Sequence, residues 1–395
     1  MKHFDHIFFG NSDLFSSFWN ANQAFPKSLS RFGRVLYIPY NFTLPRTLRY
    51  DHDLNMLKKI FKGIKIINIQ ENLFIYYPLP GIHFGIKDGR LFSLKDKVIA
   101  VSMNNFFSKI QTRFRSLISR NTIIWSTSIH THLIKKIFPD NLVIYYVYDD
   151  WRYYKHTNIE FVEKNEKKIS KLCDYVLTVS QVLTKRFKTY KARVIQSHIG
   201  VNIDFTTYNF KPQIDTNITN LGSNIIGFLG RLDNYVDFEL IKLILKKFPL
   251  SKIVIVGPIK HNLEFVKYNN LHKIINLGLL PSVGIEDVPN VVYSFDICIL
   301  PFKKNEITEA GDPMKMYDYV ISGKPIVAIK VNKDMEKFTK FAYLCENQND
   351  FIEAISRILK GRSKHVQYKQ RIDFLKKYNW DNTVLEVLEN IKDKE

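Results

Sequence analysis

The sequence has little cysteine and no long apolar run. Cys173, Cys298 and Cys345 stand singly among 395 residues, so neither a disulfide framework nor a cysteine zinc cluster is expected, and the chain is predicted to be intracellular. No apolar stretch approaches the ~20 residues that a membrane-spanning helix needs. The first residues lead into a strand-like segment without the apolar core of a signal peptide. We therefore expect a cytoplasmic protein, either soluble or bound to a membrane surface.

Two nucleotide-binding signatures are also missing. The dinucleotide fingerprint GxGxxG follows neither of the first strands expected in the two halves of the chain, which argues against an oxidoreductase. The phosphate-loop pattern GxxxxGK[ST] is absent too, which argues against a nucleotide-hydrolysing motor. No internal repeat or low-complexity tract is visible.

Positive charge is abundant and unevenly distributed. The formal net charge is +20, and residues 1–200 hold 31 Lys and Arg against 14 Asp and Glu, whereas residues 201–395 hold 27 against 24. Such an excess predicts an anionic partner: nucleic acid, an acidic membrane leaflet or a phosphate-bearing ligand. A genome rich in A and T would also favour lysine, but that bias does not explain the difference between the halves.

Short β-rich runs alternate with longer amphipathic stretches, without hairpin signals, which is typical of doubly wound parallel sheets. Helical patterns fall between the runs, for example at 15–32 and 161–172. The expected strands are His6–Gly10, Val35–Pro39, Ile64–Ile69, Thr122–Ser126, Leu142–Tyr148, Tyr175–Ser180, Arg193–Ser197, Ile225–Gly230, Lys252–Gly257, Ile274–Leu277, Ile297–Pro301, Pro325–Ile329 and Ala342–Cys345.

The pattern breaks near 202–222, where a polar stretch has no periodicity. The predicted fold class is therefore α/β, with two Rossmann-like domains joined by a short linker. Ligands of such sheets bind beyond the carboxyl ends of the strands. We expect the active site in a cleft between the two domains.

The most informative segment is 297–329, in which a helix over 313–322 lies between two apolar strands. Asp312 suits the N-cap, Pro313 the first helical position, and Gly323 the left-handed residue after the helix. Lys315 falls in the first turn, where its ammonium and the helix amino terminus together favour an anion such as a diphosphate.

Asp318 lies three residues after Lys315, on the same helical face. A ligand whose phosphates contact Lys315 would place a ribose against this carboxylate, while Met314, Tyr317 and Val320 face the sheet. The alternative is a well-capped helix with a salt bridge between Lys315 and Asp318, and spacing alone does not decide between the two.

The segment DPMKMYDYVISGKPIVA, residues 312–328, resembles the NPVKLYEYLAAGKPVVA motif of bacterial glycosyltransferases with the two-domain GT-B fold. Residues 225–240, 252–258 and 300–308 resemble the first strand, the next strand and the donor loop of their nucleotide-sugar domain. The first half resembles them more loosely, and 380–391 resembles their terminal helix. The group builds capsule, exopolysaccharide, lipopolysaccharide or teichuronic-type polymers, and it includes the xanthan glucuronosyltransferase.

The resemblance implies a division into three parts. Residues 1–205 would be a basic acceptor-binding domain facing the membrane, and residues 206–378 a nucleotide-sugar donor domain. Residues 379–395 would form a C-terminal helix that returns to the first domain. The implied activity is transfer of a sugar from a nucleoside-diphosphate sugar to a lipid-linked or growing cell-surface polysaccharide, at the inner face of the cytoplasmic membrane.

The resemblance also implies the residues that bind the donor. Lys315 would hold the diphosphate, and Asp318, where most relatives have Glu, would bind the ribose. Gly230 would let the backbone approach the phosphates, and Arg231 is either a phosphate ligand or a surface arginine. Asn305 and Thr308 would line the sugar end. The complete expected donor-binding set is Gly230, Arg231, Asn305, Thr308, Asp312, Met314, Lys315 and Asp318.

The stereochemical outcome stays open, because the wider retaining group has Glu at the position of Ala310. An inverting enzyme needs a base in the first domain, and Asp149 and Asp150, at a strand end, are the candidate catalytic residues, with Asp150 preferred. Alternatively, one acid caps the following helix and the other pairs with Arg152. The histidines expected near strand ends or the linker are a second source of a base: His130, His132 and His198.

No cofactor or catalytic metal is expected, because GT-B enzymes usually work without one. The basic first domain would bind an anionic leaflet and a polyprenyl-diphosphate-linked acceptor. The stretch 106–120, with Phe106, Ile110 and Phe114 on one arc and basic residues at its border, suits an interfacial helix or a core helix equally well. The competing functions are a basic nucleic-acid-binding protein, and a sugar epimerase or catalytically silent subunit of the same fold.

Overall fold

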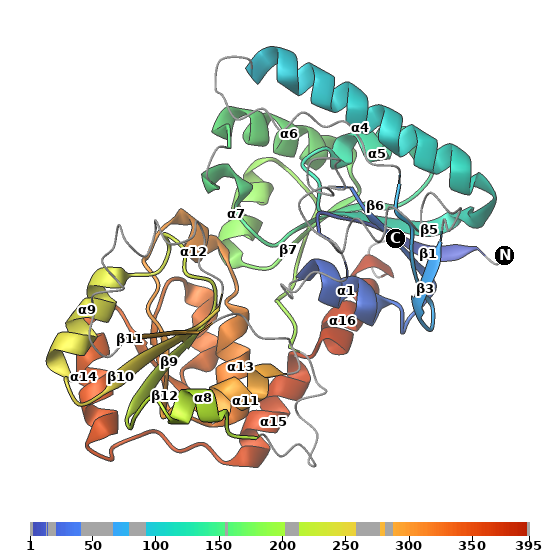
Figure 1. The fold of residues 1–395 in the computed structure, drawn as a ribbon. Coiled ribbons are helices and arrows are strands. Elements are labelled where there is room, and N and C mark those ends of the chain that lie inside the picture. The colour runs from blue at the N-terminus through green and yellow to red at the C-terminus, as the bar shows by residue number, and fades with distance from the viewer. Residues whose placement is uncertain are drawn as a thin grey trace. The chain divides into compact units, whose positions relative to one another are not determined.

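The chain forms two compact units in the computed structural model (Figure 1). Unit 1 comprises Met1–His198 and Thr383–Glu395, and unit 2 comprises Ile199–Asn382. The chain therefore passes between the units twice, after His198 and after Asn382. The structure describes residues 3–12, 14, 21–40, 66–78, 92–154, 157–201, 213–257, 277–280 and 287–392.

Unit 1 is built on an eight-stranded sheet in the order β3-β4-β2-β1-β5-β6-β7-β8. Its inner strands are continuous buried runs, as expected when helices cover both faces of a parallel sheet. The strands are β1 (Phe4–Gly10), β2 (Val35–Pro39), β3 (Ile67–Gln70), β4 (Leu73–Ile75), β5 (Ile118–Ser126), β6 (Val143–Val147), β7 (Tyr175–Thr178) and β8 (Val194–Gln196).

The edge of this sheet corrects the expectation of parallel strands without hairpins. β3 pairs with β4 in antiparallel fashion, and Asn72 in the turn between them has a φ of 60°. Asparagine is one of the few residues that adopts this left-handed conformation readily. Glu71-Asn72 between two apolar runs was therefore a hairpin signal, and β4 was missed with it.

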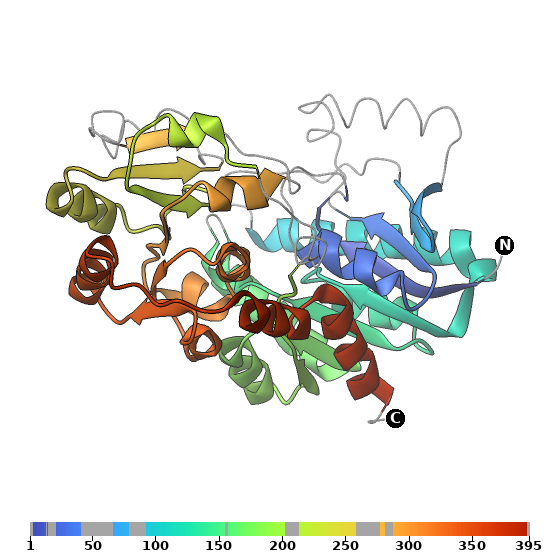
Figure 2. The same cartoon turned by 90° about the horizontal axis from the view of Figure 1, so that it is seen from below.

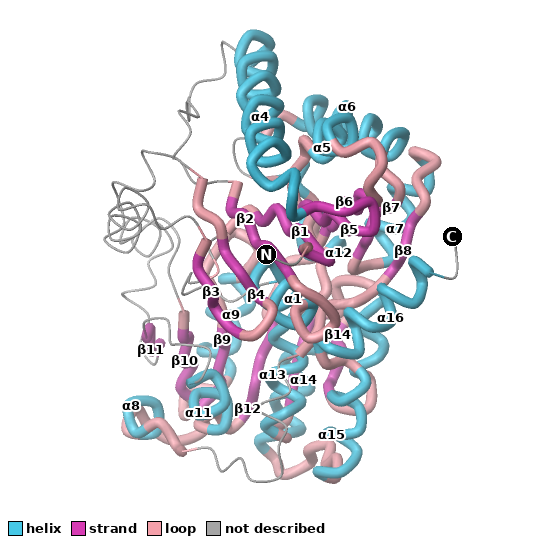
Figure 3. Tube along the Cα trace, turned by 90° about the vertical axis from the view of Figure 1, so that its right-hand side faces the viewer, coloured by secondary structure: helices cyan, strands magenta, loops and turns pink. Residues whose placement is uncertain are grey.

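The helices of unit 1 lie on both faces of its sheet. Figures 1 and 2 show α4, α5 and α6 on one face and α1 and α16 on the other. Figure 3 shows the first three side by side in cyan. The helices are α1 (Ala21–Leu29), α4 (Phe92–Phe114), α5 (Thr131–Ile137), α6 (Ile159–Leu172), α7 (Gln181–Thr189) and α16 (Trp380–Lys392).

Helix α4 settles the two interpretations of the stretch 106–120. Phe107, Ile110 and Phe114 are buried in the hydrophobic core of unit 1, and Phe106 packs against that core. The apolar arc of α4 therefore faces protein, so the described part of α4 is a core helix. The helix ends at Phe114, and residues from Ile118 onward belong to β5, which corrects the expectation of one helix through 120.

Unit 2 has a six-stranded, wholly parallel sheet in the order β11-β10-β9-β12-β13-β14. The strands are β9 (Ile225–Leu229), β10 (Lys252–Val256), β11 (Leu277–Leu280), β12 (Ile297–Leu300), β13 (Ile326–Ile329) and β14 (Ala342–Cys345). The expected strands over these segments are confirmed to within a residue, apart from Ile274–Leu277, which lies outside the described residues before Leu277.

Helices also cover both faces of the second sheet. Figure 1 shows α9 and α14 on one side, and α11, α13 and α15 on the other. The helices are α8 (Thr216–Thr219), α9 (Phe238–Lys247), α11 (Val288–Tyr293), α12 (Glu306–Ala310), α13 (Met314–Ser322), α14 (Gln348–Leu359) and α15 (Tyr368–Lys377). The expected two Rossmann-like α/β folds are thus confirmed. Most of the expected linker at 202–222 lies outside the described residues.

The close packing of unit 2 around Gly227 yields a stability prediction. This residue lies in the buried strand β9, and a methyl group there would lie 2.0 Å from Cγ of the Phe295 ring. Because the ring and the strand cannot both keep their places, we expect Gly227→Ala to lower the free energy of unfolding of unit 2 by ~1–3 kcal/mol. Urea unfolding of the full chain measures this loss.

Gly311→Ala is the matched control, because the atoms nearest to a methyl group there lie at 3.8 Å. Its effect should stay within about 0.5 kcal/mol. Equal losses in the two variants would show that the packing against Phe295 is not the cause.

Candidate functional site

The predicted donor residues lie at the topological switch point of unit 2. The chain runs from β9 outward through β10 and β11 and then returns to β12 on the other side of β9. Parallel sheets bind ligands beyond the strand ends at such a point. Gly230 directly follows β9, and α13 follows β12 through the short helix α12. Both segments therefore begin where a ligand of this sheet would bind.

A tyrosine of α13 holds the helix in this place. The hydroxyl of Tyr319 accepts a hydrogen bond from the Leu229 amide of β9 (2.9 Å) and donates one to the Ile299 carbonyl of β12 (3.2 Å). The helix ends at Gly323, whose φ of 69° confirms the expected left-handed residue. The interaction of Tyr319 with both strands was not apparent from the sequence, since it depends on their adjacency.

Two glycines bring the backbone close together in front of the strands. Gly230 has a φ of 157° and Gly257 a φ of 149°. A methyl group at Gly257 would lie 2.2 Å from the Gly230 carbonyl oxygen, so a side chain there would separate the two turns. A methyl group at Gly230 would lie 3.5 Å from Cε of Lys315. The side chain of Lys315 therefore extends from α13 toward the turn after β9.

Lys315 and Asp318 are both half-buried and keep their charged groups unengaged. Within the part of the chain that the structure describes, neither side chain forms a hydrogen bond or an ion pair, so the alternative salt bridge between them is not formed. Burial raises the pKa of Asp318 to about 6, and the nearby charge of Lys315 opposes that rise. An unpaired cation and an acid with a raised pKa on one helical face are a frequent signature of a binding site.

Asp312 does not play the expected part of helix cap. The residue at the N-cap is Pro313, and no side chain caps the helix. The buried carboxylate of Asp312 instead accepts hydrogen bonds from the Ile199 amide (3.0 Å), the Tyr317 hydroxyl (3.0 Å) and the Lys337 ammonium (2.9 Å to each oxygen). Its acceptor positions are filled by protein, which leaves little for a donor molecule.

Asn305 and Thr308 form the turn that begins α12. The Asn305 side chain accepts from the amides of Ile307 and Thr308 (3.1 Å each), and the Thr308 hydroxyl donates to the Lys303 carbonyl (2.6 Å). This capping box accounts for the hydrogen bonds of the Thr308 hydroxyl. Any contact of these residues with a sugar remains a prediction.

Met314 is half-buried and Arg231 is exposed. Met314 is half-buried at the first position of α13 and does not join the core, unlike Tyr317 and Val320, which do. The expectation that all three face the sheet is therefore wrong for Met314. Arg231 is 43% exposed and has its Nε 3.7 Å from the Asp233 carboxylate.

In unit 1, Asp150 caps a 3-10 turn and also forms an ion pair with Arg152. The alternative interpretation divided these two roles between Asp149 and Asp150. Asp150 lies after β6 and accepts from the Arg152 amide at the start of the 3-10 turn Trp151–Tyr153. Arg152 and Arg186 both form ion pairs with it. Burial raises the pKa of Asp150, but hydrogen bonds and charge from the two arginines outweigh that effect and hold it below the ordinary value. A carboxylate held in this way is a weak base, which argues against Asp150 as the base; the catalytic role of Asp149 or Asp150 stays a prediction.

Arg186 is shared with a second buried acid. Its guanidinium lies 2.9 Å from Glu166 of α6. Burial raises the pKa of Glu166 to about 7, against the opposing charge of Arg186. The network of Asp150, Arg152, Arg186 and Glu166 thus ties the segment after β6 to helices α6 and α7.

The three histidines that are candidate bases, His130, His132 and His198, have different surroundings. His130 and His132 are buried at the start of α5, and burial and neighbouring positive charges lower the pKa of His132 to about 3. Such a group stays neutral and has little tendency to take up a proton. His198 interacts with α16, with Nδ1 3.2 Å from the Thr383 hydroxyl and Nε2 3.7 Å from Glu386.

A polar cluster at the switch point of unit 1 was missed in the sequence. The side chain of Asn11, which follows β1, donates to the Tyr148 hydroxyl (2.9 Å). The side-chain amide of Asn22, on α1, also donates to this hydroxyl. The Thr127 hydroxyl, after β5, donates to the Asn22 side-chain oxygen (3.1 Å). These residues follow β1, β5 and β6 or lie on α1, so no local pattern joined them.

Asp149 lies next to this cluster. Burial raises the pKa of the Tyr148 hydroxyl well above its ordinary value, and the charge of Asp149 raises it further. The carboxylate therefore acts electrostatically on the hydroxyl around which Asn11 and Asn22 are arranged. In the described part of the chain, no group of three His, Cys, Asp or Glu side chains is arranged to hold a metal ion.

The donor segment matches a known family. Residues 223–361 match the model of the family Glycosyl transferases group 1. Over 161 residues, the chain is 26% identical to TuaH of Bacillus subtilis, a protein named as a glycosyltransferase of teichuronic acid biosynthesis. That alignment covers 40% of this chain and 40% of TuaH.

Solved structures resemble the chain over nearly its whole length. Alr3699/HepE of Anabaena, in complex with UDP and glucose, has a TM-score of 0.65 at 13% identity and covers 99% of this chain and 100% of its own. The trehalose-6-phosphate synthase OtsA has a TM-score of 0.72 at 9% identity and covers 98% of each chain. The expected fold is confirmed: the chain has the GT-B fold, and residues 223–361 match the glycosyl transferases group 1 family.

Proposed function

We propose that the protein is a glycosyltransferase that moves a sugar from a nucleoside-diphosphate sugar to an acceptor hydroxyl. The observation that carries this proposal is the pair of unengaged charges, Lys315 and Asp318, beside the Gly230 turn at the switch point of unit 2. The matched glycosyltransferase domain spans all three residues. The similar HepE structure is a complex with UDP and glucose, and a similar E. coli trehalose-6-phosphate structure is bound with UDP-2-fluoro glucose.

The donor site supplies what the leaving group needs. Departure of a nucleoside diphosphate places negative charge on its terminal phosphate, and fixed positive charge stabilises that state most when it is already in position. The Lys315 ammonium and the amino terminus of α13 provide such charge. The glycine at 230 has no side chain that would keep phosphates away from the turn after β9, and Asp318 accepts from ribose hydroxyls.

Unit 1 is proposed to bind the acceptor. Its switch-point cluster of Asn11, Asn22, Thr127 and Tyr148 has side chains that both donate and accept hydrogen bonds, as recognition of sugar hydroxyls requires. Asp149 is the proposed base, because Asp150 is held by two arginines. We propose that the reaction needs no resident metal or other cofactor.

We further propose that the acceptor is a lipid-linked or growing cell-surface polysaccharide, bound at the inner face of the cytoplasmic membrane. The name of TuaH, teichuronic acid biosynthesis, supports a polymer of this kind. In the described part of the chain, no helix has the length and apolar character to cross a membrane. Contact with a leaflet would therefore use the surface of the protein.

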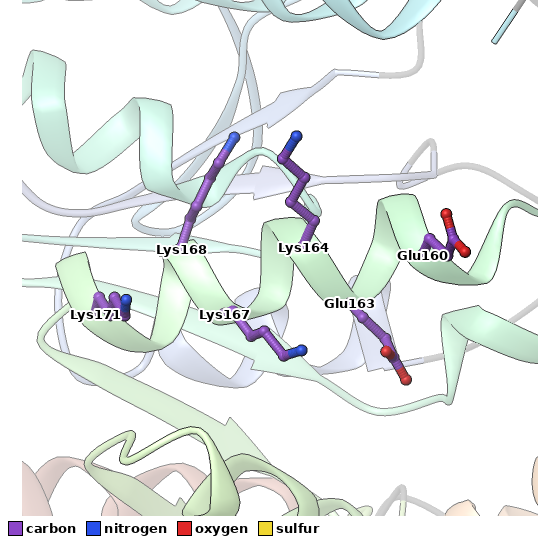
Figure 4. A pocket seen from close by; sticks show the side chains of 6 residues that line it. All are labelled: Glu160, Glu163, Lys164, Lys167, Lys168 and Lys171. Carbon is purple, nitrogen blue, oxygen red and sulfur yellow. The ribbon is translucent and has the colours of Figure 1, made fainter. Parts of the chain in front are cut away.

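The exposed face of α6 is the proposed contact. Lys164, Lys167, Lys168 and Lys171 line a hollow along this helix together with Glu160 and Glu163 (Figure 4). Lys164 and Lys168 extend to one side of the helix. Each lysine near an anionic surface contributes ~1 kcal/mol to binding.

The competing functions find less support. The largest fully buried side chains include Trp125, Tyr37, Tyr145 and Phe8, so these aromatic rings are core residues and are not exposed for base stacking, as a nucleic-acid binder would need. A sugar epimerase or a silent subunit of this fold differs in one measurable respect. Release of nucleoside diphosphate should depend on an acceptor only in a transferase.

Loss of the Lys315 ammonium tests the proposed activity. A thermal-shift panel of nucleotide sugars identifies the donor, and acceptor-dependent release of nucleoside diphosphate then measures turnover. Because Lys315→Ala removes one fixed charge from the leaving group, turnover should fall ~10²-fold or more. The exposed residue Lys340 of the same unit provides the control Lys340→Ala, which should retain wild-type turnover, and EDTA should leave both rates unchanged. Wild-type activity in Lys315→Ala would contradict the donor site.

The raised pKa of Asp318 predicts opposite effects on stability and binding. A pKa raised from 3.8 to about 6 means that the folded state binds the proton more tightly than the unfolded state, so this group lowers stability as the pH rises from about 4 to about 6, and the loss is complete above pH 6. Asp318→Asn should therefore raise the melting temperature at pH 7.5, with a gain that shrinks toward pH 4.

Donor affinity should change in the other direction. The ionised Asp318 accepts from ribose hydroxyls, so wild-type affinity should fall as the pH drops through about 6, and Asp318→Asn should lose ~10-fold or more in affinity at pH 7.5. Asp373→Asn, at an exposed position of α15, is the control. A less stable Asp318→Asn protein with unchanged donor affinity would assign the carboxylate to the fold.

The membrane proposal is tested with vesicles of phosphatidylglycerol and phosphatidylcholine. Reversing the charge of Lys164 and Lys168 to Glu should weaken sedimentation with the anionic vesicles at least ~10-fold, in line with ~1 kcal/mol for each charge. The control reverses Lys246 and Lys247, two exposed lysines of α9, and should bind as the wild type does. Equal binding to neutral vesicles, or no effect of the α6 variant, would count against this surface.

A further inference from the structure

The two segments by which the chain passes between its units are paired inside unit 2. The Val201 amide donates to the Tyr378 carbonyl (2.8 Å), and the Trp380 amide donates to the Val201 carbonyl (3.3 Å). Gly200 lies so close to Trp380 that a methyl group there would be 2.5 Å from the indole ring. These hydrogen bonds and this packing join the segments into one ribbon, called here the crossing ribbon: Ile199–Val201 with Tyr378–Trp380.

Asp312 attaches the start of α13 to this ribbon. Its carboxylate accepts from the Ile199 amide at 3.0 Å, directly after the first crossing. In the sequence it is separated from Lys315 only by Pro313, which restricts the backbone, and Met314. The first turn of α13 and the first strand of the crossing ribbon are therefore held by the same buried side chain.

Lys337 extends this attachment to the second strand of the ribbon. Its ammonium lies 2.9 Å from both carboxylate oxygens of Asp312. It also lies over the rings of Tyr317, Phe338 and Tyr378, at 5.1 to 5.3 Å from each centroid. Tyr378 belongs to the ribbon through its carbonyl. The buried Asp312 and the half-buried Lys337 thus contact both crossing segments.

We propose that Asp312 is a positioning residue that couples occupation of the donor site to the conformation of the crossing ribbon. This inference rests on the proposed diphosphate site at Lys315. A diphosphate that draws the Lys315 ammonium toward Gly230 restrains the first turn of α13 through the Lys315 side chain. Asp312 passes that change to the Ile199 amide, and Lys337 passes it to Tyr378. The crossing ribbon then becomes more strongly held when the donor is bound.

Amide hydrogen exchange with inorganic pyrophosphate as the ligand tests the coupling. Pyrophosphate carries the diphosphate chemistry without requiring knowledge of the nucleotide base. In the wild-type chain it should slow exchange of the Ile199 and Val201 amides at least ~5-fold, because ligand binding suppresses local opening of the segments that it stabilises. Lys315→Ala should abolish the effect, which shows that it arises at the donor site.

Two variants separate coupling from simple structural support. Asp312→Ala removes the acceptor of the Ile199 amide, and Lys337→Met keeps the carboxylate but removes the ammonium. Both should still bind pyrophosphate within a few-fold of wild type, while the ligand-dependent slowing at Ile199 and Val201 disappears. Lys330→Met, which removes the half-buried partner of the exposed Glu336, is the control and should keep the slowing. If Asp312→Ala fails to fold, Lys337→Met carries the test alone.

The outcomes distinguish this inference from the proposed function. Failure of pyrophosphate to bind, or binding that Lys315→Ala leaves intact, contradicts the donor site and the coupling with it. Binding through Lys315 with no slowing at Ile199 in the wild type leaves the donor site in place and overturns the coupling. Slowing that persists in Lys337→Met and Asp312→Ala also overturns it, because the signal then travels by another route.

Discussion

The position of α13 depends on one buried hydroxyl. Tyr319 binds β9 and β12 at the same time, and these strands lie on the two sides of the switch point of the sheet. Because a helix is rigid over its length, fixing Tyr319 also fixes the first turn, where Lys315 extends toward Gly230. The geometry of the proposed donor site therefore follows from the pairing of β9 with β12 and from the hydrogen bonds of Tyr319 to both strands.

The acids of the molecule acquire different properties from their surroundings. Asp312 and Asp150 are surrounded by donors, with a lysine or two arginines beside each. Asp318 is half-buried and has no donor among the described residues, and burial raises its pKa to about 6. Removing a carboxylate from water without pairing it costs stability. A fold retains such a group most readily where a ligand supplies the missing donors, which is why Asp318 is the better candidate for ligand binding.

Much of the fold was predictable from the sequence, because buried parallel strands are continuous apolar runs that need no partner to be recognised. β14 over Ala342–Cys345 has the expected bounds. The errors arose where the sequence pattern has two solutions. The apolar arc of 106–120 suited a membrane surface or a core, and the strand expected at Ile64–Ile69 came without β4, which follows the turn at Asn72. In both cases tertiary packing, which a local sequence pattern does not contain, determined the structure that formed.

The candidate site was predictable only where it is local. Lys315, Asp318 and Gly323 are marked by spacing along one helix, so their places on α13 follow from the sequence. Asp312 has the sequence features of an N-cap, yet Lys337, far along the chain, engages its carboxylate instead. A cap offers hydrogen bonds of modest strength, whereas a buried ammonium without a counter-ion is costly. The carboxylate of Asp312 therefore pairs with Lys337 and does not cap α13.

The two switch points differ in chemistry, and the difference supports the proposed division between a donor-binding unit 2 and an acceptor-binding unit 1. In unit 2 the unengaged groups are the ammonium of Lys315 and the carboxylate of Asp318, beside the turn at Gly230. This arrangement suits a ligand with phosphates and a ribose. In unit 1 the cluster around Tyr148 consists of neutral amides and hydroxyls, with one carboxylate, Asp149, acting on it. Neutral groups that donate and accept discriminate among hydroxyls without attracting a second diphosphate to the same place. The proposed transfer would use this asymmetry, because the donor reacts with loss of a charged diphosphate whereas the acceptor reacts through a neutral hydroxyl.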